Sequence, residues 1–303
     1  MPKLSESIES YLFSLDNDHF STLTFRNYKH YLERFLEFVI SRGNKKPGIK
    51  HINLSLVKEY SNFLPKIGLS LKTQGFHLIA LRSFLRWVRE KGYNSLEPGS
   101  INIPKAQSAK LKFLTGDQID RLLNAPSLST IQGKRDKAIL EVLFSTGLRI
   151  SELVKLNRDK LDLEEREFGI MDNGGRTRIV FLSNRATDWI KKYLSSRKDH
   201  FKPLFLRHKG KIEPSVPDEK TRLTPRSIQR MVKKYVRKIN LPVDASPHTI
   251  RHSYAADLLM AGADIRSVQK MLGHKNISTT QIYTHVTNKQ LRDIHEAFHG
   301  RGK

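Results

Sequence analysis

The segment Ser246-Pro247-His248-Thr249-Ile250-Arg251-His252 has the features of a helix start. Serine is a favoured N-cap and proline is favoured at the first helical position, so the helix is predicted to begin at Pro247. His248 and Arg251 are three residues apart and therefore share one face of the first turn. Free backbone N–H groups and the helix dipole favour an anion at this point. The segment thus predicts a helix that presents a histidine and an arginine to a bound anion.

Three further segments each carry one candidate side chain. These are Arg149 in Thr146-Gly147-Leu148-Arg149, at a predicted helix start, His274 just after a short amphipathic helix that Gly273 closes, and Tyr283 in a further capped turn, nine residues beyond His274. Gly147 stands where the C-terminus of a helix requires a positive φ angle.

The charge of the chain indicates a polyanionic partner. Its 303 residues contain 54 Lys and Arg against 30 Asp and Glu, a net charge of +24, and the basic excess occurs in both halves. Such an excess disfavours a compact state unless a polyanion screens it, and nucleic acid is the favoured partner. No apolar run is long enough to span a membrane, and the N-terminus carries early acidic residues, so we expect a cytoplasmic protein without a membrane partner.

Several common kinds of site are excluded by the residues present. There are no cysteines, which excludes thiol catalysis and thiolate metal sites. His248 and His252 have the spacing of a zinc helix, but Thr249 stands where a zinc protease needs its general base. We therefore predict no metal and no cofactor.

The four segments together resemble the tyrosine recombinase and phage integrase family. Thr-Gly-Leu-Arg-x-Ser-Glu-Leu, His-x-x-Arg-His, Leu-Gly-His and a tyrosine nine residues after that histidine occur here in the family's order. The resemblance covers nearly the whole chain and favours a compact, Xer-like member. It implies that Arg149, His248, Arg251 and His274 surround one DNA phosphate and that Tyr283 attacks it.

The chemistry of strand transfer accounts for these residue types. Two guanidinium groups can hold the non-bridging oxygens of a phosphodiester and match their developing charge without a metal. Tyrosine has a pKa of about 10 and needs a base, a role that a nearby histidine can fill. The resemblance implies a 3′-phosphotyrosyl intermediate and strand exchange between two duplexes by a homotetramer at a specific recombination site.

The predicted fold is mainly α-helical with a small β-sheet. Residues 1–103 are predicted to form a basic helical bundle, which the resemblance identifies as a SAM-like core-binding domain. Residues 104–112 are predicted to be a linker, and residues 113–303 an α+β catalytic domain. Asn173-Gly174 between two β-prone runs at 167–182 predicts a hairpin. An apolar stripe over 288–298 predicts a terminal helix, which in the resembled family links protomers.

One position departs from the family. Asn173 occupies the hairpin position where the family usually has a lysine that protonates the leaving 5′ oxygen, and an asparagine amide cannot supply that proton. This predicts slower cleavage, or proton donation by another basic group.

Further basic residues are candidates for DNA contact, with a solvated surface as the alternative. They are Arg82, Arg86 and Arg89 on one side of a predicted helix, Arg176 and Arg178 in the hairpin, and Lys233, Lys234 and Arg237.

Three other functions remain open from sequence. A type IB topoisomerase uses similar chemistry as a monomer, and the terminal stripe argues against it. A catalytically weak or inactive DNA-binding regulator would account for Asn173. An RNA- or ribosome-binding protein fits the charge but leaves the ordered motifs unexplained.

Overall fold

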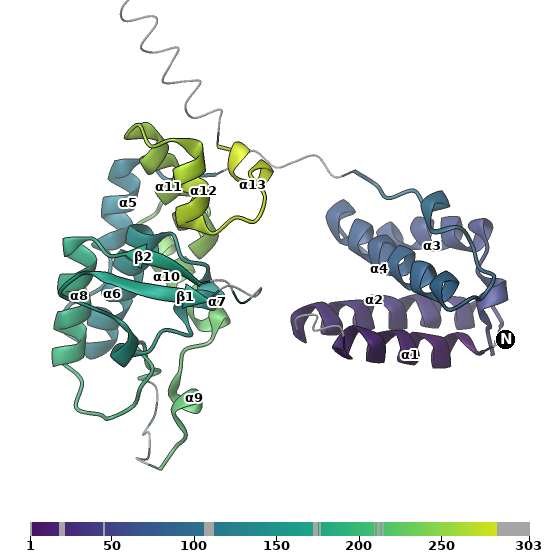
Figure 1. Cartoon of the computed structure of the whole chain (residues 1–303), viewed down its shortest axis with the longest axis horizontal. Coiled ribbons are helices and arrows are strands. Elements are labelled where there is room, and N and C mark those ends of the chain that lie inside the picture. The colour runs from purple at the N-terminus through teal and green to yellow at the C-terminus, as the bar shows by residue number, and fades with distance from the viewer. Residues whose placement is uncertain are drawn as a thin grey trace, which may run out of the picture. The chain divides into compact units, whose positions relative to one another are not determined.

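The computed structural model describes most of the chain. The described residues are 2–17, 22–44, 46–105, 112–171, 175, 177–208, 210, 213 and 215–283. They form a mainly helical protein with one small sheet, which confirms the predicted fold class (Figure 1). The chain divides into two compact units, an N-terminal unit of residues 1–109 and a C-terminal unit of residues 110–303.

The N-terminal unit is a helical bundle. Its elements are α1 (Leu4–Asn17), α2 (Thr22–Ser41), α3 (Leu54–Lys66) and α4 (Leu71–Glu90), with single turns η1 (Ile49–His51) and η2 (Pro98–Ser100). The helix α4 packs against the other three because its apolar residues Leu78, Leu81, Leu85 and Val88 recur at three- and four-residue steps. All four are buried, so this stripe forms the centre of the bundle's core.

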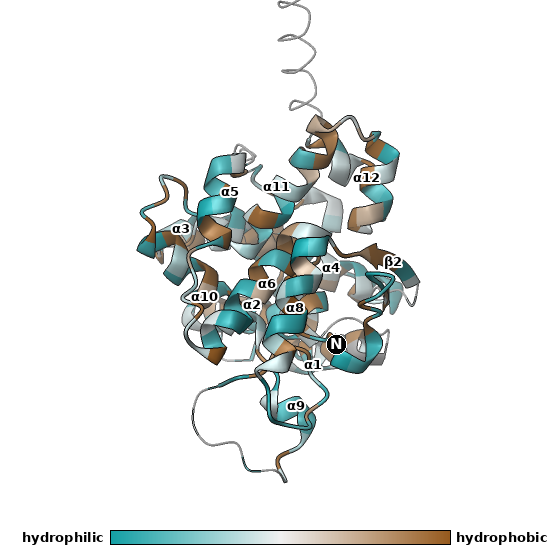
Figure 2. Ribbon diagram, turned by 90° about the vertical axis from the view of Figure 1, so that its left-hand side faces the viewer, coloured by the Kyte–Doolittle hydropathy of each residue, from teal (hydrophilic) through white to brown (hydrophobic). Residues whose placement is uncertain are grey.

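The C-terminal unit is built around one buried helix. Its elements are α5 (Gly116–Leu123), α6 (Ile131–Thr146), α7 (Ile150–Leu153), η3 (Arg158–Lys160), β1 (Glu167–Met171), β2 (Thr177–Phe181), α8 (Asn184–Ser195), α9 (Asp218–Thr221), α10 (Pro225–Lys238), α11 (Pro247–Met260), α12 (Ile265–Leu272) and α13 (Ser278–Gln281). α6 contacts α5, α8, α11 and β2 and is buried along most of its length. α8 turns Ala186, Ile190 and Tyr193 toward this core and shows hydrophilic colours on its outer face in Figure 2.

The two strands form the antiparallel hairpin that the sequence predicts. Glu167 pairs with Phe181 at one end of the ladder and Met171 with Thr177 at the other. Phe168 and Val180 are buried against the core. Residues 172–174 and 176, and with them Asn173 and Arg176, lie outside the described residues.

Most helix boundaries follow the predicted capping residues. Thr115 accepts from the Gln118 N–H, and Ser246 from the Thr249 N–H. α6 begins at Ile131 because Thr130 caps it. α13 ends at Gln281, since the Tyr283 N–H bonds the Thr280 carbonyl three residues back and so forms a tighter turn.

Some expectations fall outside the described part of the chain. Residues 106–111 of the predicted linker and the predicted terminal helix at 288–298 are not among the described residues. None of the described helices combines the length and the apolar composition that a membrane span needs.

Candidate active site

Arg149 follows a tight turn at the end of α6. Gly147 ends that helix with φ +58°, and an added Cβ there would lie 2.3 Å from Cδ1 of Tyr254. Arg149 then caps α7, and its backbone N–H donates to Oε2 of Glu152 at 2.8 Å. Its guanidinium donates to Oε1 of Glu152 and to the Gly273 carbonyl, each at 3.0 Å. Only glycine fits the turn that places this arginine, because both the φ angle and the neighbouring ring exclude a side chain.

Arg251 is placed by the first turns of α11. Its guanidinium is buried and donates to the carbonyls of Gly147 and Leu272, the second at 2.6 Å. Burial, followed by the nearby charge of Arg149, lowers the pKa of Arg251 to about 10. The group therefore remains a cation at neutral pH and keeps its positive charge available to an anion.

His274 lies directly after the C-terminal end of α12. Gly273 ends that helix with φ +64°, and the His274 N–H donates to the Gln269 carbonyl. Its Nδ1 lies 2.9 Å from Oγ1 of Thr280. Burial, followed by the charges of Arg251 and Arg149, lowers the pKa of His274 to about 4, so the ring is neutral at pH 7.

Tyr283 is almost fully buried, with 1% of its surface exposed. Its ring packs in a small apolar cluster with Leu259, Val268 and Leu272. Its hydroxyl lies 2.6 Å from Nδ1 of His252. The His252 ring packs edge-on against the His248 ring, with 4.4 Å between the ring centroids. Burial raises the pKa of the Tyr283 hydroxyl, and the charge of Arg251 partly opposes this rise.

A carboxylate holds two arginines at this site. Arg178 of β2 donates to both oxygens of Glu152, at 3.0 and 2.8 Å. Burial alone would raise the pKa of Glu152, but hydrogen bonds from Arg178 and from the Arg149 N–H more than offset it and hold that pKa below its usual value. An added Cβ at Gly273 would lie 2.7 Å from Nη1 of Arg178. The hairpin, α7 and the end of α12 are therefore tied together around Glu152.

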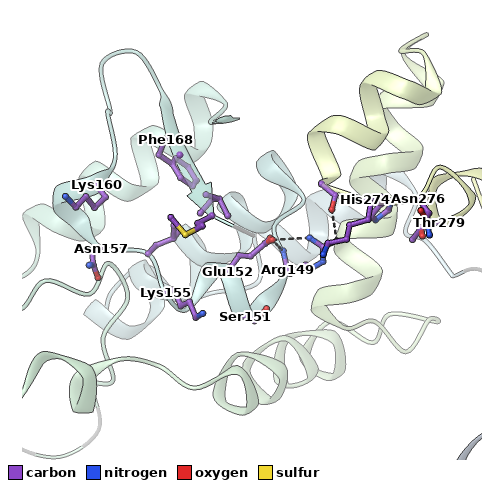
Figure 3. A pocket seen from close by; sticks show the side chains of 16 residues that line it. Arg149, Ser151, Glu152, Lys155, Asn157, Lys160, Phe168, His274, Asn276 and Thr279 are labelled. Carbon is purple, nitrogen blue, oxygen red and sulfur yellow. Dashed lines mark hydrogen bonds and ion pairs between the residues drawn. The ribbon is translucent and has the colours of Figure 1, made fainter. Parts of the chain in front are cut away.

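A pocket of about 650 Å³ opens beside this network. Arg149, Glu152 and His274 line it, and Figure 3 shows the Arg149 side chain extending between the other two. The lysines of the pocket wall are Lys155, Lys160 and Lys275. Its charge suits an anion, and the described residues include no group of three or more His, Cys, Asp or Glu side chains placed to hold a metal ion.

The structure brings the five predicted site residues to connected elements. Arg149 and Arg251 share the carbonyls at the end of α12, and His274 follows that end. Tyr283 reaches the same helix as His248 and Arg251 through its bond to His252.

The candidate DNA-binding residues have varied surroundings. Arg82 donates to the Ile101 carbonyl, and Arg89 pairs with Glu97 at 3.0 Å. Arg178 is engaged with Glu152. The exposed members of the set are Arg86, Arg89, Lys233, Lys234 and Arg237, and Arg176 lies outside the described residues.

The sequence motifs assign no catalytic role to His252 or to Glu152. The only clue to a role was sequence position, since His252 is one turn after His248 and Glu152 is three residues after Arg149 in the motif itself. Neither position reveals its partner, because those contacts depend on how α13 and β2 pack.

The chain is similar to known proteins over most of its length. Residues 112–290 match the phage integrase family, and residues 8–92 match the phage integrase N-terminal SAM-like domain. The chain is 35% identical to the tyrosine recombinase XerC of Thermodesulfovibrio yellowstonii, covering 93% of this chain and 92% of that one. It is 32% identical to the tyrosine recombinase XerD of Listeria monocytogenes serotype 4b, covering 98% and 100%.

Solved structures share the fold. The XerH site-specific recombinase bound to its palindromic difH substrate has a TM-score of 0.70 at 21% identity, covering 91% of this chain and 80% of that one. The Tn1549 transposon integrase in complex with transposon right end DNA has a TM-score of 0.73 at 18% identity, covering 97% and 99%. The family matches and the relatives together show that the chain belongs to the phage integrase family, the tyrosine recombinases, a class of enzymes that transesterify DNA strands.

Proposed function

We propose that this chain is a site-specific recombinase that cuts and rejoins DNA through a 3′-phosphotyrosyl link to Tyr283. The observation that carries this proposal is the shared anchoring of Arg149 and Arg251 on the carbonyls that end α12, next to His274. Two fixed guanidinium groups with a histidine beside them suit the trigonal-bipyramidal phosphorus of strand transfer, whose non-bridging oxygens gain charge. Because the cations are anchored in advance, they need little rearrangement when the charge develops.

The cleavage step needs no high-energy cofactor. The oxygen of Tyr283 attacks phosphorus and the 5′ oxygen of the next nucleotide leaves, so one phosphodiester replaces another. Attack by a 5′ hydroxyl on the phosphotyrosyl link then rejoins a strand. Exchange occurs when that hydroxyl comes from a second duplex.

The partner is double-stranded DNA with a specific recombination site, bound by four copies of the chain on two sites in the cytoplasm. Relatives named as Xer recombinases and neighbours solved on recombination-site DNA support this choice. Exposed cations on α10, among them Lys233 and Arg237, suit contact with phosphates. DNA affinity should therefore fall steeply with rising salt concentration.

Covalent capture tests the proposal and recovers the DNA site in the same experiment. The purified protein is incubated with sheared genomic DNA of its own organism, denatured in detergent, and the fragments that remain attached are sequenced. A nicked duplex of the recovered sequence, whose short 5′-hydroxyl product diffuses away, then traps the adduct for peptide mapping. The proposal expects one recurrent DNA sequence and an adduct on Tyr283. An adduct on another residue, or none at all, contradicts it.

A weak or inactive DNA-binding regulator is the second candidate, and Asn173 favours it. Asn173→Lys restores the proton donor that the family usually carries. If the wild-type chain is slow for want of this group, the substitution raises the cleavage rate on the nicked duplex by about 100-fold. An unchanged rate shows that another group supplies the proton.

A further inference from the structure

The hydroxyl of Tyr283 has a defined partner that lies outside the four phosphate-binding residues of the motif. Nδ1 of His252 is 2.6 Å from that hydroxyl, and the two ring centroids are 5.5 Å apart. Both side chains are held by their surroundings, because Tyr283 lies in an apolar cluster and the His252 ring packs against His248. The contact joins an acid to a group that can take its proton.

The neighbouring histidine His274 is engaged differently. Its Nδ1 lies 2.9 Å from Oγ1 of Thr280. His248 contacts the ring of His252, on the side of α11 that also carries Arg251. A general base must lie within hydrogen-bond reach of the proton that it removes, and His252 meets this requirement in the structure.

We propose that His252 is a further catalytic residue, the group that accepts the proton of Tyr283 during strand cleavage. This inference rests on the proposed function. In the step, the Oη–H bond of Tyr283 breaks and the proton moves to Nδ1 of His252, while an electron pair of Oη forms the bond to phosphorus. The bond from phosphorus to the 5′ oxygen breaks, and that oxygen leaves with the bonding pair and takes a proton from water.

Rejoining reverses each transfer. The 5′ hydroxyl attacks phosphorus and gives its proton back to the solvent. The bond from phosphorus to Oη of Tyr283 breaks, and Oη recovers its proton from Nδ1 of His252. The enzyme therefore ends in its starting protonation state.

The surroundings of His252 keep its ring neutral at pH 7. The titratable and charged groups that face it are His248 and Arg251 on its own helix, Tyr283 beyond α13, and His274 beyond α12. Burial, followed by His248 and Arg251, lowers the pKa of His252 to about 4, so Nδ1 can accept a proton at neutral pH. A bound phosphodiester adds a negative charge opposite Arg251 and offsets the cation that disfavours protonation of His252.

The test compares substitutions that separate hydrogen bonding from proton transfer. His252→Asn leaves an amide oxygen near the position of Nδ1, which can accept the hydrogen bond but not the proton. His252→Ala removes both functions and opens space for an added base. The matched control is His208→Gln, because Nε2 of His208 lies 2.9 Å from the hydroxyl of Tyr193 in a second tyrosine–histidine pair of the same unit.

The readout is single-turnover adduct formation on the nicked duplex. We expect both His252 variants to form adduct about 100-fold more slowly while they retain wild-type DNA binding and thermal unfolding, and His208→Gln to keep the wild-type rate. Added imidazoles should restore the rate of His252→Ala, more strongly as the pKa of the added base rises. A structural role would not produce that dependence.

Two results overturn the inference. One is a wild-type rate for His252→Asn, and the other is a His252→Ala rate that does not depend on the pKa of the added base. In both cases the wild-type chain still forms its adduct, so the proposed function stands. A wild-type chain that forms no adduct with any DNA contradicts the proposed function instead.

Discussion

The two units of the molecule each contain a buried tyrosine whose hydroxyl is within hydrogen-bond distance of Nδ1 of a histidine. In the N-terminal unit Tyr60 lies 2.9 Å from His77, and in the C-terminal unit Tyr283 lies 2.6 Å from His252. Burial is the main cause that lowers the pKa of both histidines to about 4 and raises the pKa of both tyrosines. The two pairs therefore begin from nearly the same chemistry.

Their arginine neighbours differ. Nη1 of Arg34 lies 3.5 Å from Nε2 of His77, so this cation contacts the histidine ring directly. Arg251 instead donates to backbone carbonyls and acts on Tyr283 through its charge, which lowers the tyrosine pKa. The two pairs thus differ in their nearest arginine, which contacts the histidine ring in one unit and is anchored on backbone carbonyls in the other.

Removal of each hydroxyl should give the largest contrast between the units. Tyr283→Phe should abolish covalent capture of the nicked duplex and leave binding of intact DNA unchanged, because only the nucleophile is lost. Tyr60→Phe should keep the wild-type cleavage rate and lower the free energy of unfolding by about 1 kcal/mol. Denaturing gels and urea titrations measure the two effects. Covalent capture by Tyr283→Phe would end the comparison.

Exchange of the neighbouring arginines is the next test. Arg251→Lys should slow adduct formation by about 100- to 1,000-fold, because an ammonium cannot reproduce the two carbonyl bonds and the charge presented to phosphate. Arg34→Lys keeps a cation beside His77 in the unit that lacks Tyr283, and it should leave the cleavage rate unchanged. Equal rates for the two variants would show that the position of the cation does not matter.

The third test compares alanine substitutions at Gly147 in the C-terminal unit and at Gly43 in the N-terminal unit. Gly147→Ala should lower the free energy of unfolding by about 3 kcal/mol, since a positive φ is combined with a clash against Tyr254. Gly43→Ala also has a positive φ, +92°, but its Cβ would meet nothing within 4 Å, so the cost should be about 1 kcal/mol. Thermal unfolding of the two variants gives the difference. A larger loss for Gly43→Ala would contradict it.

Lowering the pH should reduce the free energy of unfolding through His77, the histidine partner of Tyr60. The pKa of His77 is about 4 when folded against 6.5 ordinarily, so between these values the unfolded chain binds more protons and stability falls as the pH falls. Between pH 6.5 and pH 5 this histidine should contribute at most about 2 kcal/mol of that loss. His77→Gln should show a smaller drop in urea midpoint than the wild type over this range. An equal drop would assign the acid sensitivity to other groups.

The sequence was sufficient for features that depend on neighbouring residues. The capping residues Thr115 and Ser246, the helix end at Gly147 and the hairpin at 167–182 were each predictable from a few consecutive residues. These features depend on local backbone hydrogen bonding and on φ preferences, which the residue type itself sets.

Contacts between distant segments were not predictable in this way. Arg178 was a candidate for DNA contact, yet its guanidinium is bound to Glu152, 26 residues earlier. His252 had no assigned role, yet its Nδ1 lies within hydrogen-bond distance of the hydroxyl of Tyr283, 31 residues later. Such contacts depend on the packing of whole elements, and a single sequence contains no direct record of which polar side chains meet.

The carbonyls at the end of α12 connect the two arginines energetically. Leu272 accepts from Arg251 at 2.6 Å and lies 3.5 Å from Arg149, while Gly273 accepts from Arg149 at 3.0 Å. Loss of either guanidinium removes a donor from this helix end and loosens the support of the other. Rate losses at positions 149 and 251 should consequently not multiply, and a double-mutant cycle between them should show a coupling free energy. Replacement of either Arg149 or Arg251 therefore alters the contribution of the other arginine to the cleavage rate.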